Sequence, residues 1–78
     1  MQYKTKEEKF LCALYKEKEA PQDRYKVGEG LGYSSKGVDI IVQLLTKGNF
    51  ITKEGDIDVL MTDHGVRWVE TYTEIASN

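Results

Sequence analysis

Few residues in this chain have the types and spacing that catalysis or metal binding requires. Cys12 and His64 are its single cysteine and single histidine, too few to close a zinc site or an internal disulfide. The glycine-rich run 28–32 precedes a helical pattern, but no strand–turn–helix nucleotide-binding unit surrounds it. No nucleophile is paired with a base. We therefore expect no catalysis, metal, cofactor or small-molecule substrate, with Cys12 half-buried and His64 on the surface.

The composition is typical of a single soluble globular domain. The 78 residues leave room for one hydrophobic core, so we assign 1–78 to one domain. Hydrophobic residues make up 40% and charged residues 31% of the chain, which argues against disorder and against a membrane span. Eleven basic and 13 acidic residues give a net charge of −2. That balance excludes a strongly basic nucleic-acid binder but allows a local basic patch. The lone thiol and the lack of an apolar signal sequence predict a cytoplasmic protein.

A capping box predicts the first helix. Thr5 and Glu8 have the spacing at which each side chain bonds the other's backbone amide, which opens a helix over about 6–19. The apolar residues of this segment recur at helical spacing on one face, namely Phe10, Leu11 and Leu14. Pro21 separates this helix from the next element.

A second, shorter helix is predicted over 24–31, with Asp23 as its N-cap. Gly28 and Gly30 each lower its helical propensity by about 1 kcal/mol relative to alanine. We expect both glycines to be there because a neighbouring helix packs closely against them. Gly32 then ends the helix in the left-handed conformation that glycine adopts without strain.

The third predicted helix begins after Ser34 or Ser35, runs to Lys47 and is closed by Gly48. Projected at 100° per residue, one stripe is apolar and is expected to face inward: Val38, Ile41, Val42 and Leu45. The opposite stripe is expected to face outward: Lys36, Ile40, Gln43 and Lys47. An outward isoleucine is unusual on a surface that contacts only water.

After Gly48 the hydrophobic period changes to two, which predicts strands over 50–53 and 57–61 joined by a tight turn containing Gly55. Thr62 is the N-cap of a last helix, expected from Asp63 to Ile75. Val66, Val69 and Tyr72 are expected to pack inward, with Trp68 and Ile75 on one edge. The predicted class is therefore α+β, mostly α, in the order helix, helix, helix, hairpin, helix.

Three segments carry a resemblance to a known family. Residues 45–51 (LTKGNFI) are similar to the L-x-x-G-x-[hydrophobic]-I join between a recognition helix and a wing. Residues 61–65 (MTDHG) resemble the L-T-x-x-G segment that leads into a terminal helix, and 31–34 (LGYS) resembles the turn before the recognition helix. Each motif is weak alone, but the ordered set covers most of the chain. The chain thus resembles winged helix-turn-helix domains of small MarR- or PadR-type transcriptional regulators.

The resemblance implies that the third helix lies in the major groove of double-stranded DNA, with the wing against the backbone or minor groove. The positions that correspond to DNA-facing residues are Ser34, Ser35, Lys36, Ile40, Gln43, Lys47 and, near the wing tip, Lys53. The serine hydroxyls and the helix N-terminus would hold a phosphate. Gln43 would bond adenine and Ile40 would touch a thymine methyl group. Arg24, Lys26 and the N-terminal lysines would add phosphate contacts from the flank.

The charge of this segment keeps a second function open. Residues 34–61 hold three lysines (Lys36, Lys47, Lys53) against four acids (Asp39, Glu54, Asp56, Asp58) and no arginine, although arginine makes the commonest specific base contact. One copy should bind DNA weakly, and a homodimer more strongly. The alternative is a protein-interaction module with the winged fold and no significant DNA affinity. Trp68, Tyr72 and Ile75 belong either to the core, the interpretation we favour, or to a dimer or partner surface.

Overall fold

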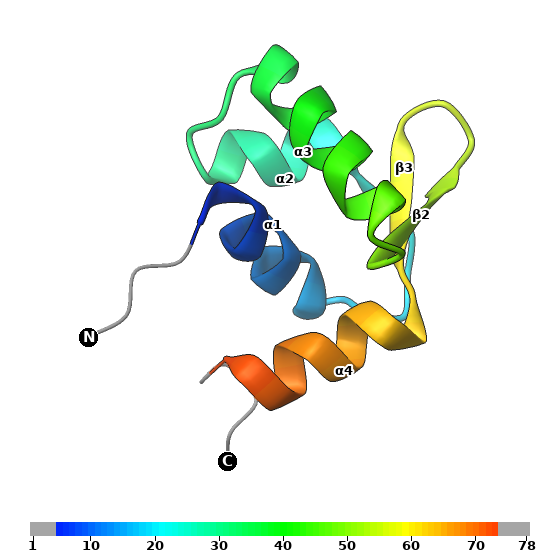
Figure 1. The fold of residues 1–78 in the computed structure, drawn as a ribbon. Coiled ribbons are helices and arrows are strands. Elements are labelled where there is room, and N and C mark those ends of the chain that lie inside the picture. The colour runs from blue at the N-terminus through cyan, green and yellow to red at the C-terminus, as the bar shows by residue number, and fades with distance from the viewer. Residues whose placement is uncertain (1–4, 74–78) are drawn as a thin grey trace.

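Four helices and a three-stranded antiparallel sheet make up residues 5–73, the part of the chain that the computed structural model describes (Figure 1). The helices are α1 (Lys6–Tyr15), α2 (Arg24–Gly30), α3 (Ser35–Lys47) and α4 (Asp63–Tyr72). The strands are β1 (Gln22–Asp23), β2 (Ile51–Glu54) and β3 (Asp58–Met61), with β3 in the centre of the sheet. The predicted α+β class and the order of helices and hairpin are confirmed, and β1 is an addition.

Each helix begins where a side chain can satisfy the free amides of its first turn. The four N-caps are Thr5, Asp23, Ser34 and Thr62. The capping box of α1 is present, since the Glu8 amide donates to the Thr5 hydroxyl at 3.1 Å and the Thr5 amide donates to the Glu8 carboxylate at 2.9 Å. The choice between Ser34 and Ser35 is resolved in favour of Ser34, whose Oγ accepts from the Gly37 amide.

Helix α1 ends at Tyr15, four residues before the predicted end. The amide of Gln22 in β1 donates from Nε2 to the carbonyl oxygens of Leu14 at 2.8 Å and Glu17 at 3.1 Å. Each of these carbonyls also accepts a backbone amide, from Glu17 and Ala20 respectively, so the Gln22 side chain adds a second bond to each. The chain turns over 16–19 instead of continuing the helix.

The sheet has a buried face and an exposed one. Val59 of β3 lies opposite Gln22 of β1 and Lys53 of β2, while Asp58 lies opposite Asp23 and Glu54. Because directly paired residues share a face and neighbours alternate, these two rungs point to opposite sides. Val59 is fully buried, so its rung faces the helices and the acidic rung faces away. Both hairpin strands begin one residue later than predicted, at Ile51 and Asp58.

The hydrophobic core joins α1, α3, α4 and the inner face of the sheet. Its buried side chains include the predicted apolar stripes of α1 and α3, together with residues from the hairpin and α4: Phe10, Leu11, Leu14, Val38, Ile41, Val42, Leu45, Ile51, Val59, Met61 and Val69. Cys12 is also buried, so the expectation that it would be half-exposed is wrong. It packs within the same cluster because α1 is covered on more than one side.

The two glycines of α2 differ in their surroundings. A Cβ on Gly28 would come closer than 3.0 Å to Cγ2 of Val38 in α3, whereas a Cβ on Gly30 would meet nothing within 4 Å. The predicted close helix contact is therefore confirmed at Gly28 and wrong at Gly30, which lies two residues further along, roughly 200° around the helix, and faces open space. Gly32 (φ 80°) and Gly55 (φ 82°) have the left-handed backbone predicted for them.

Two of the sequence motifs meet where α4 leaves the sheet. The hydroxyl of Thr62 donates to the carbonyl of Asn49 at 2.6 Å, and its amide donates to the carbonyl of Phe50 at 3.1 Å. Any side chain on Gly65 would overlap the Phe50 carbonyl. Thr62 and Gly65 are thus required because the start of α4 lies directly on the join between α3 and β2, with Asn49 at a positive φ of 65°.

Helix α4 packs on α1 with one face only. Val69 is fully buried and Val66 partly buried, as predicted. Tyr72 is 67% exposed, so its assignment to the core is wrong. It lies in the last turn of α4, and its ring contacts that of Trp68, which is itself only partly buried. Described residues of α4 end at Tyr72, with Thr73 as C-cap, and the predicted end at Ile75 lies outside the described residues.

Candidate nucleic-acid interface

One side of α3 is open to solvent along its whole length. The residues predicted for this face are all exposed: Ser34, Ser35, Lys36, Ile40, Gln43 and Lys47. The opposite stripe of α3 is buried in the core. The Ser34 hydroxyl already accepts the Gly37 amide at 3.1 Å, so it retains its own proton as a donor, while Ser35 lies in the open first turn. This face combines cationic, amide and apolar side chains.

Lys53 is exposed on β2 and belongs to the rung of Val59, on the side of the sheet that the helices cover. Glu54 and Asp58 belong to the other rung and point to the opposite side. Asp23 of β1 extends that acidic rung across all three strands. The hairpin therefore places Lys53 on one side of the sheet and Glu54 and Asp58 on the other.

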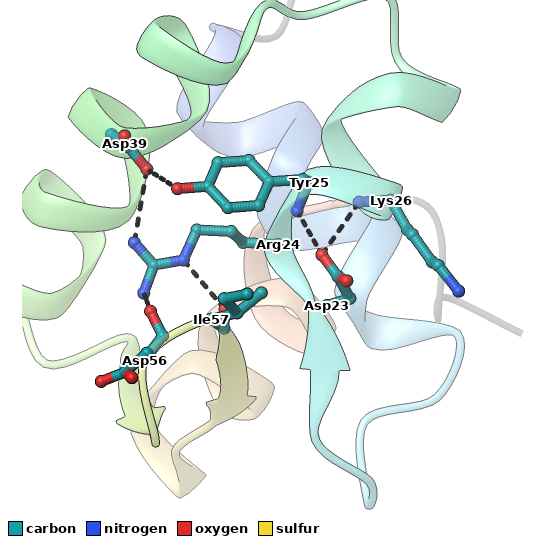
Figure 2. Close-up of polar contacts among 7 residues, drawn as sticks. All are labelled: Asp23, Arg24, Tyr25, Lys26, Asp39, Asp56 and Ile57. Carbon is teal, nitrogen blue, oxygen red and sulfur yellow. Dashed lines mark hydrogen bonds and ion pairs between the residues drawn. The ribbon is translucent and has the colours of Figure 1, made fainter.

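Arg24 fixes the turn of the hairpin from inside the fold, as Figure 2 shows. Its Nε donates to the carbonyl of Ile57 at 2.9 Å and its Nη2 to the carbonyl of Asp56 at 3.2 Å. Its Nη1 forms an ion pair with Asp39 of α3 at 3.5 Å. Arg24 is only 7% exposed, so the expectation that it contacts phosphate from the flank is wrong. It instead connects the start of α2, the hairpin turn and α3.

Asp39, on the flank of the open face, is held by two partners. Besides Arg24, the hydroxyl of Tyr25 donates to its Oδ1 at 2.7 Å (Figure 2). This hydrogen bond, together with partial burial, raises the pKa of Tyr25 above its ordinary value of 10.0. The carboxylate is therefore turned toward α2 and compensated by the guanidinium. No feature of the sequence indicated this cluster, because Asp39 lies 14 residues from Tyr25 and 15 from Arg24.

Two further apolar residues are exposed, one on α3 and one at the hairpin turn. Leu44 is 49% exposed, one turn after Ile40, which is 54% exposed, and Ile57 at the hairpin turn is 43% exposed. The i, i+4 spacing from Ile40 to Leu44 is the signal that could have revealed the strip. Exposed aliphatic side chains at such spacing are typical of a contact surface, whether with thymine methyl groups or with protein.

The second predicted surface consists of aromatic rings on α4. Trp68 is partly buried and lies between Phe50, with ring centroids 6.1 Å apart, and the exposed Tyr72, at 5.6 Å. His64 is exposed, as predicted, and stacks on the other side of Phe50 at 4.7 Å. Ile75, the third residue assigned to this surface, lies outside the described residues.

Among residues 5–73 no group of three or more His, Cys, Asp or Glu side chains is arranged to hold a metal ion. Within the same residues no helix has the length and apolar character needed to cross a bilayer. No family model, curated protein or solved structure matches the chain.

Proposed function

We propose that the chain is a winged helix-turn-helix domain that binds double-stranded DNA, with α3 in the major groove and the β2–β3 hairpin as the wing. The observation that carries this proposal is the open face of α3, which presents Lys36, Gln43 and Lys47 beside the hairpin. A helix presented in this way fits the width of the major groove. The regulatory role that goes with such domains belongs to the same proposal, as does a cytoplasmic location.

The positions of the charged side chains in space favour DNA binding more than the count of three lysines and four acids in residues 34–61 suggests. Asp39 is compensated by Arg24, and Glu54 and Asp58 lie on the face of the sheet opposite to Lys53. Lys36, Lys47 and Lys53 are all exposed. Three phosphate contacts give an expected slope of log K against log salt of about −2.7 per domain, from roughly 0.9 per neutralised phosphate.

The first test is an NMR titration with a mixed-sequence duplex at low salt, with amide shifts followed along the chain. We expect shifts concentrated in 34–47 and 53–56 that added salt reverses. Lys36→Gln and Lys47→Gln should each weaken binding and reduce the salt slope by about 0.9. Lys9→Gln, which removes an exposed charge from α1, is the matched control and should change neither. An absence of shifts at high DNA concentration, or equal effects of all three variants, would contradict the proposal.

The exposure of Ile40, Leu44 and Ile57 favours a second candidate, a protein-interaction module that includes self-association as a homodimer. Under this alternative, Ile40→Ser and Leu44→Ser should reduce the association measured by sedimentation or abolish binding to a partner, and the lysine variants should have little effect. The two candidates therefore predict opposite outcomes for the same set of variants.

A further inference from the structure

A cavity of about 210 Å³ opens between the first turn of α1, the end of α3 and the middle of α4. It lies apart from Lys36 and Gln43 on the open face of α3. Side chains from three separate segments line it: Thr5, Glu7, Glu8, Leu11, Leu45, Phe50 and Trp68. Its position and lining do not belong to the surface proposed for DNA.

The wall of the cavity is apolar and aromatic. Leu11 and Leu45 are 2% and 5% exposed and form part of the core, and the rings of Phe50 and Trp68 meet edge to face with centroids 6.1 Å apart. Such a wall accepts the aliphatic stem of a side chain. The faces of aromatic rings also attract a cation, tryptophan most strongly.

The α1 side of the cavity is acidic. The Glu7 carboxylate makes no hydrogen bond or ion pair with residues 5–73, although burial and, to a smaller extent, this charge raise the pKa of Tyr33. The Glu8 carboxylate uses only Oε1, which accepts the Thr5 amide at 2.9 Å. Two carboxylates outweigh the roughly half positive charge at the N-terminus of a helix. The neighbouring Lys6 ammonium lies over the ring of Tyr33, 5.7 Å from its centroid, and is not part of the lining.

We propose that this cavity binds the guanidinium group of an arginine side chain presented by a protein partner. A planar guanidinium can stack on the Trp68 or Phe50 ring while its N–H groups donate to Glu7 and Glu8. The cavity is smaller than the roughly 300–1,000 Å³ of most small-molecule sites, and its size suits a single side chain. Tyr72, 67% exposed and next to Trp68, continues the aromatic surface outward, where it can contact the rest of the partner.

The experiment uses the fluorescence of Trp68, the only tryptophan in the chain. The probe is the tripeptide acetyl-Gly-Arg-Gly-amide, compared with the same peptide carrying citrulline, the uncharged isostere of arginine, and with one carrying glutamate. We expect saturable binding of the arginine peptide on the order of millimolar, as its few contacting atoms suggest. The citrulline peptide should bind at least tenfold more weakly, and the glutamate peptide should not bind.

Glu7→Gln combined with Glu8→Gln removes both charges while glutamine preserves the capping box, so the fold should be retained. This variant should lose at least tenfold in affinity for the arginine peptide, whereas Glu29→Gln, at an exposed position on α2, should lose none. Equal binding of the arginine and citrulline peptides, or no binding at all, would overturn the proposal. If n-propylguanidinium bound tenfold more tightly than the peptide, the cavity would exclude a peptide backbone and the protein source would be wrong. The test involves no DNA, so its outcome is independent of the function proposed above.

Discussion

The contact between α2 and α3 can be tested by adding a single methyl group at Gly28. The Cβ of Gly28→Ala would approach Cγ2 of Val38 closer than 3.0 Å, while its next neighbours, Cβ of Val38 and Cβ of Tyr33, would lie at ordinary distances of 3.5 and 3.8 Å. The conflict is therefore with one methyl group. Val38 cannot avoid it by rotating, because a valine in a helix strongly prefers one χ1 rotamer. The two helices would have to move apart.

The expected cost follows from two opposing contributions. Overpacking of a core costs about 1–3 kcal/mol, and alanine in place of glycine in a helix returns up to about 1 kcal/mol. Gly28→Ala should therefore destabilise the domain by about 1–2 kcal/mol, or lower its Tm by roughly 5–15 °C for a domain of this size. Gly30→Ala is the matched control in the same helix. Its Cβ meets nothing within 4 Å, so this variant should be neutral or stabilised by up to about 1 kcal/mol.

Urea and thermal unfolding of both variants, alone and in a Val38→Ala background, provide the assay. Val38→Ala is itself destabilising because it empties part of the core. In that background, however, the methyl group that causes the conflict is gone, so Gly28→Ala should cost nothing or become stabilising. The coupling energy of this double-mutant cycle should be about 1–3 kcal/mol. Equal stability of Gly28→Ala and Gly30→Ala, or an unchanged cost in the Val38→Ala background, would show that the Val38 methyl group does not limit the approach of α2 to α3.

Three other substitutions test single interactions. Arg24→Met keeps the aliphatic stem but removes the donors to the hairpin turn. It should lower the free energy of unfolding by about 1–3 kcal/mol and accelerate amide hydrogen exchange over 55–57. Arg67→Met, at an exposed position on α4, is the control and should not accelerate this exchange. Thr46 has a buried hydroxyl with no partner in the described part of the chain. Thr46→Val should therefore raise the free energy of unfolding measured in urea by about 1 kcal/mol, and a lower free energy of unfolding would contradict this. The folded-state pKa of Tyr25 is raised by its hydrogen bond to Asp39, so that bond stabilises the fold below pH 10 and its contribution is lost as pH rises through the folded pKa. Tyr25→Phe should therefore be less stable than wild type at neutral pH, with the difference shrinking in melts at alkaline pH; a constant difference would rule out this coupling.

Local signals predict where the helices begin to within one residue. Thr5, Ser34 and Thr62 each precede an apolar-periodic segment, and each accepts the backbone amide of the residue three positions further on. Capping depends only on residues that are close in sequence. The positive φ values of Gly32 and Gly55 follow from equally local requirements of helix ends and turns.

The features that the sequence did not predict depend on contacts between distant residues. The carbonyls of Leu14 and Glu17 are bonded by the side chain of Gln22, five to eight residues downstream, and β1 is only two residues long, too short to show a period. Which side of α4 is covered depends on the tertiary packing of the helix, and so Tyr72 lies exposed despite its favourable position in the helical pattern. Arg24 bonds backbone atoms 32 and 33 residues away, and no pattern in the sequence encodes that reach.

The burial of Arg24 leads to a prediction about which base pairs the domain would prefer. This arginine is committed to the hairpin turn, so in the proposed complex the residues of α3 that would meet the base edges are Gln43 and Ile40, both exposed, with Lys36 and Lys47 at the two ends of the helix. Glutamine pairs with adenine and an aliphatic side chain contacts the thymine methyl group, whereas guanine is read chiefly by arginine or lysine. We therefore expect duplexes rich in A·T at the contacted positions to be bound more tightly than G·C-rich duplexes of equal length. A good bidentate contact contributes about 1–3 kcal/mol of discrimination, so Gln43→Ala should reduce the preference by roughly fivefold or more while leaving the salt dependence of binding unchanged. Competition between the two duplexes at fixed salt measures this directly, and a preference for G·C, or one that persists in Gln43→Ala, would show that α3 does not contact the bases in the proposed orientation.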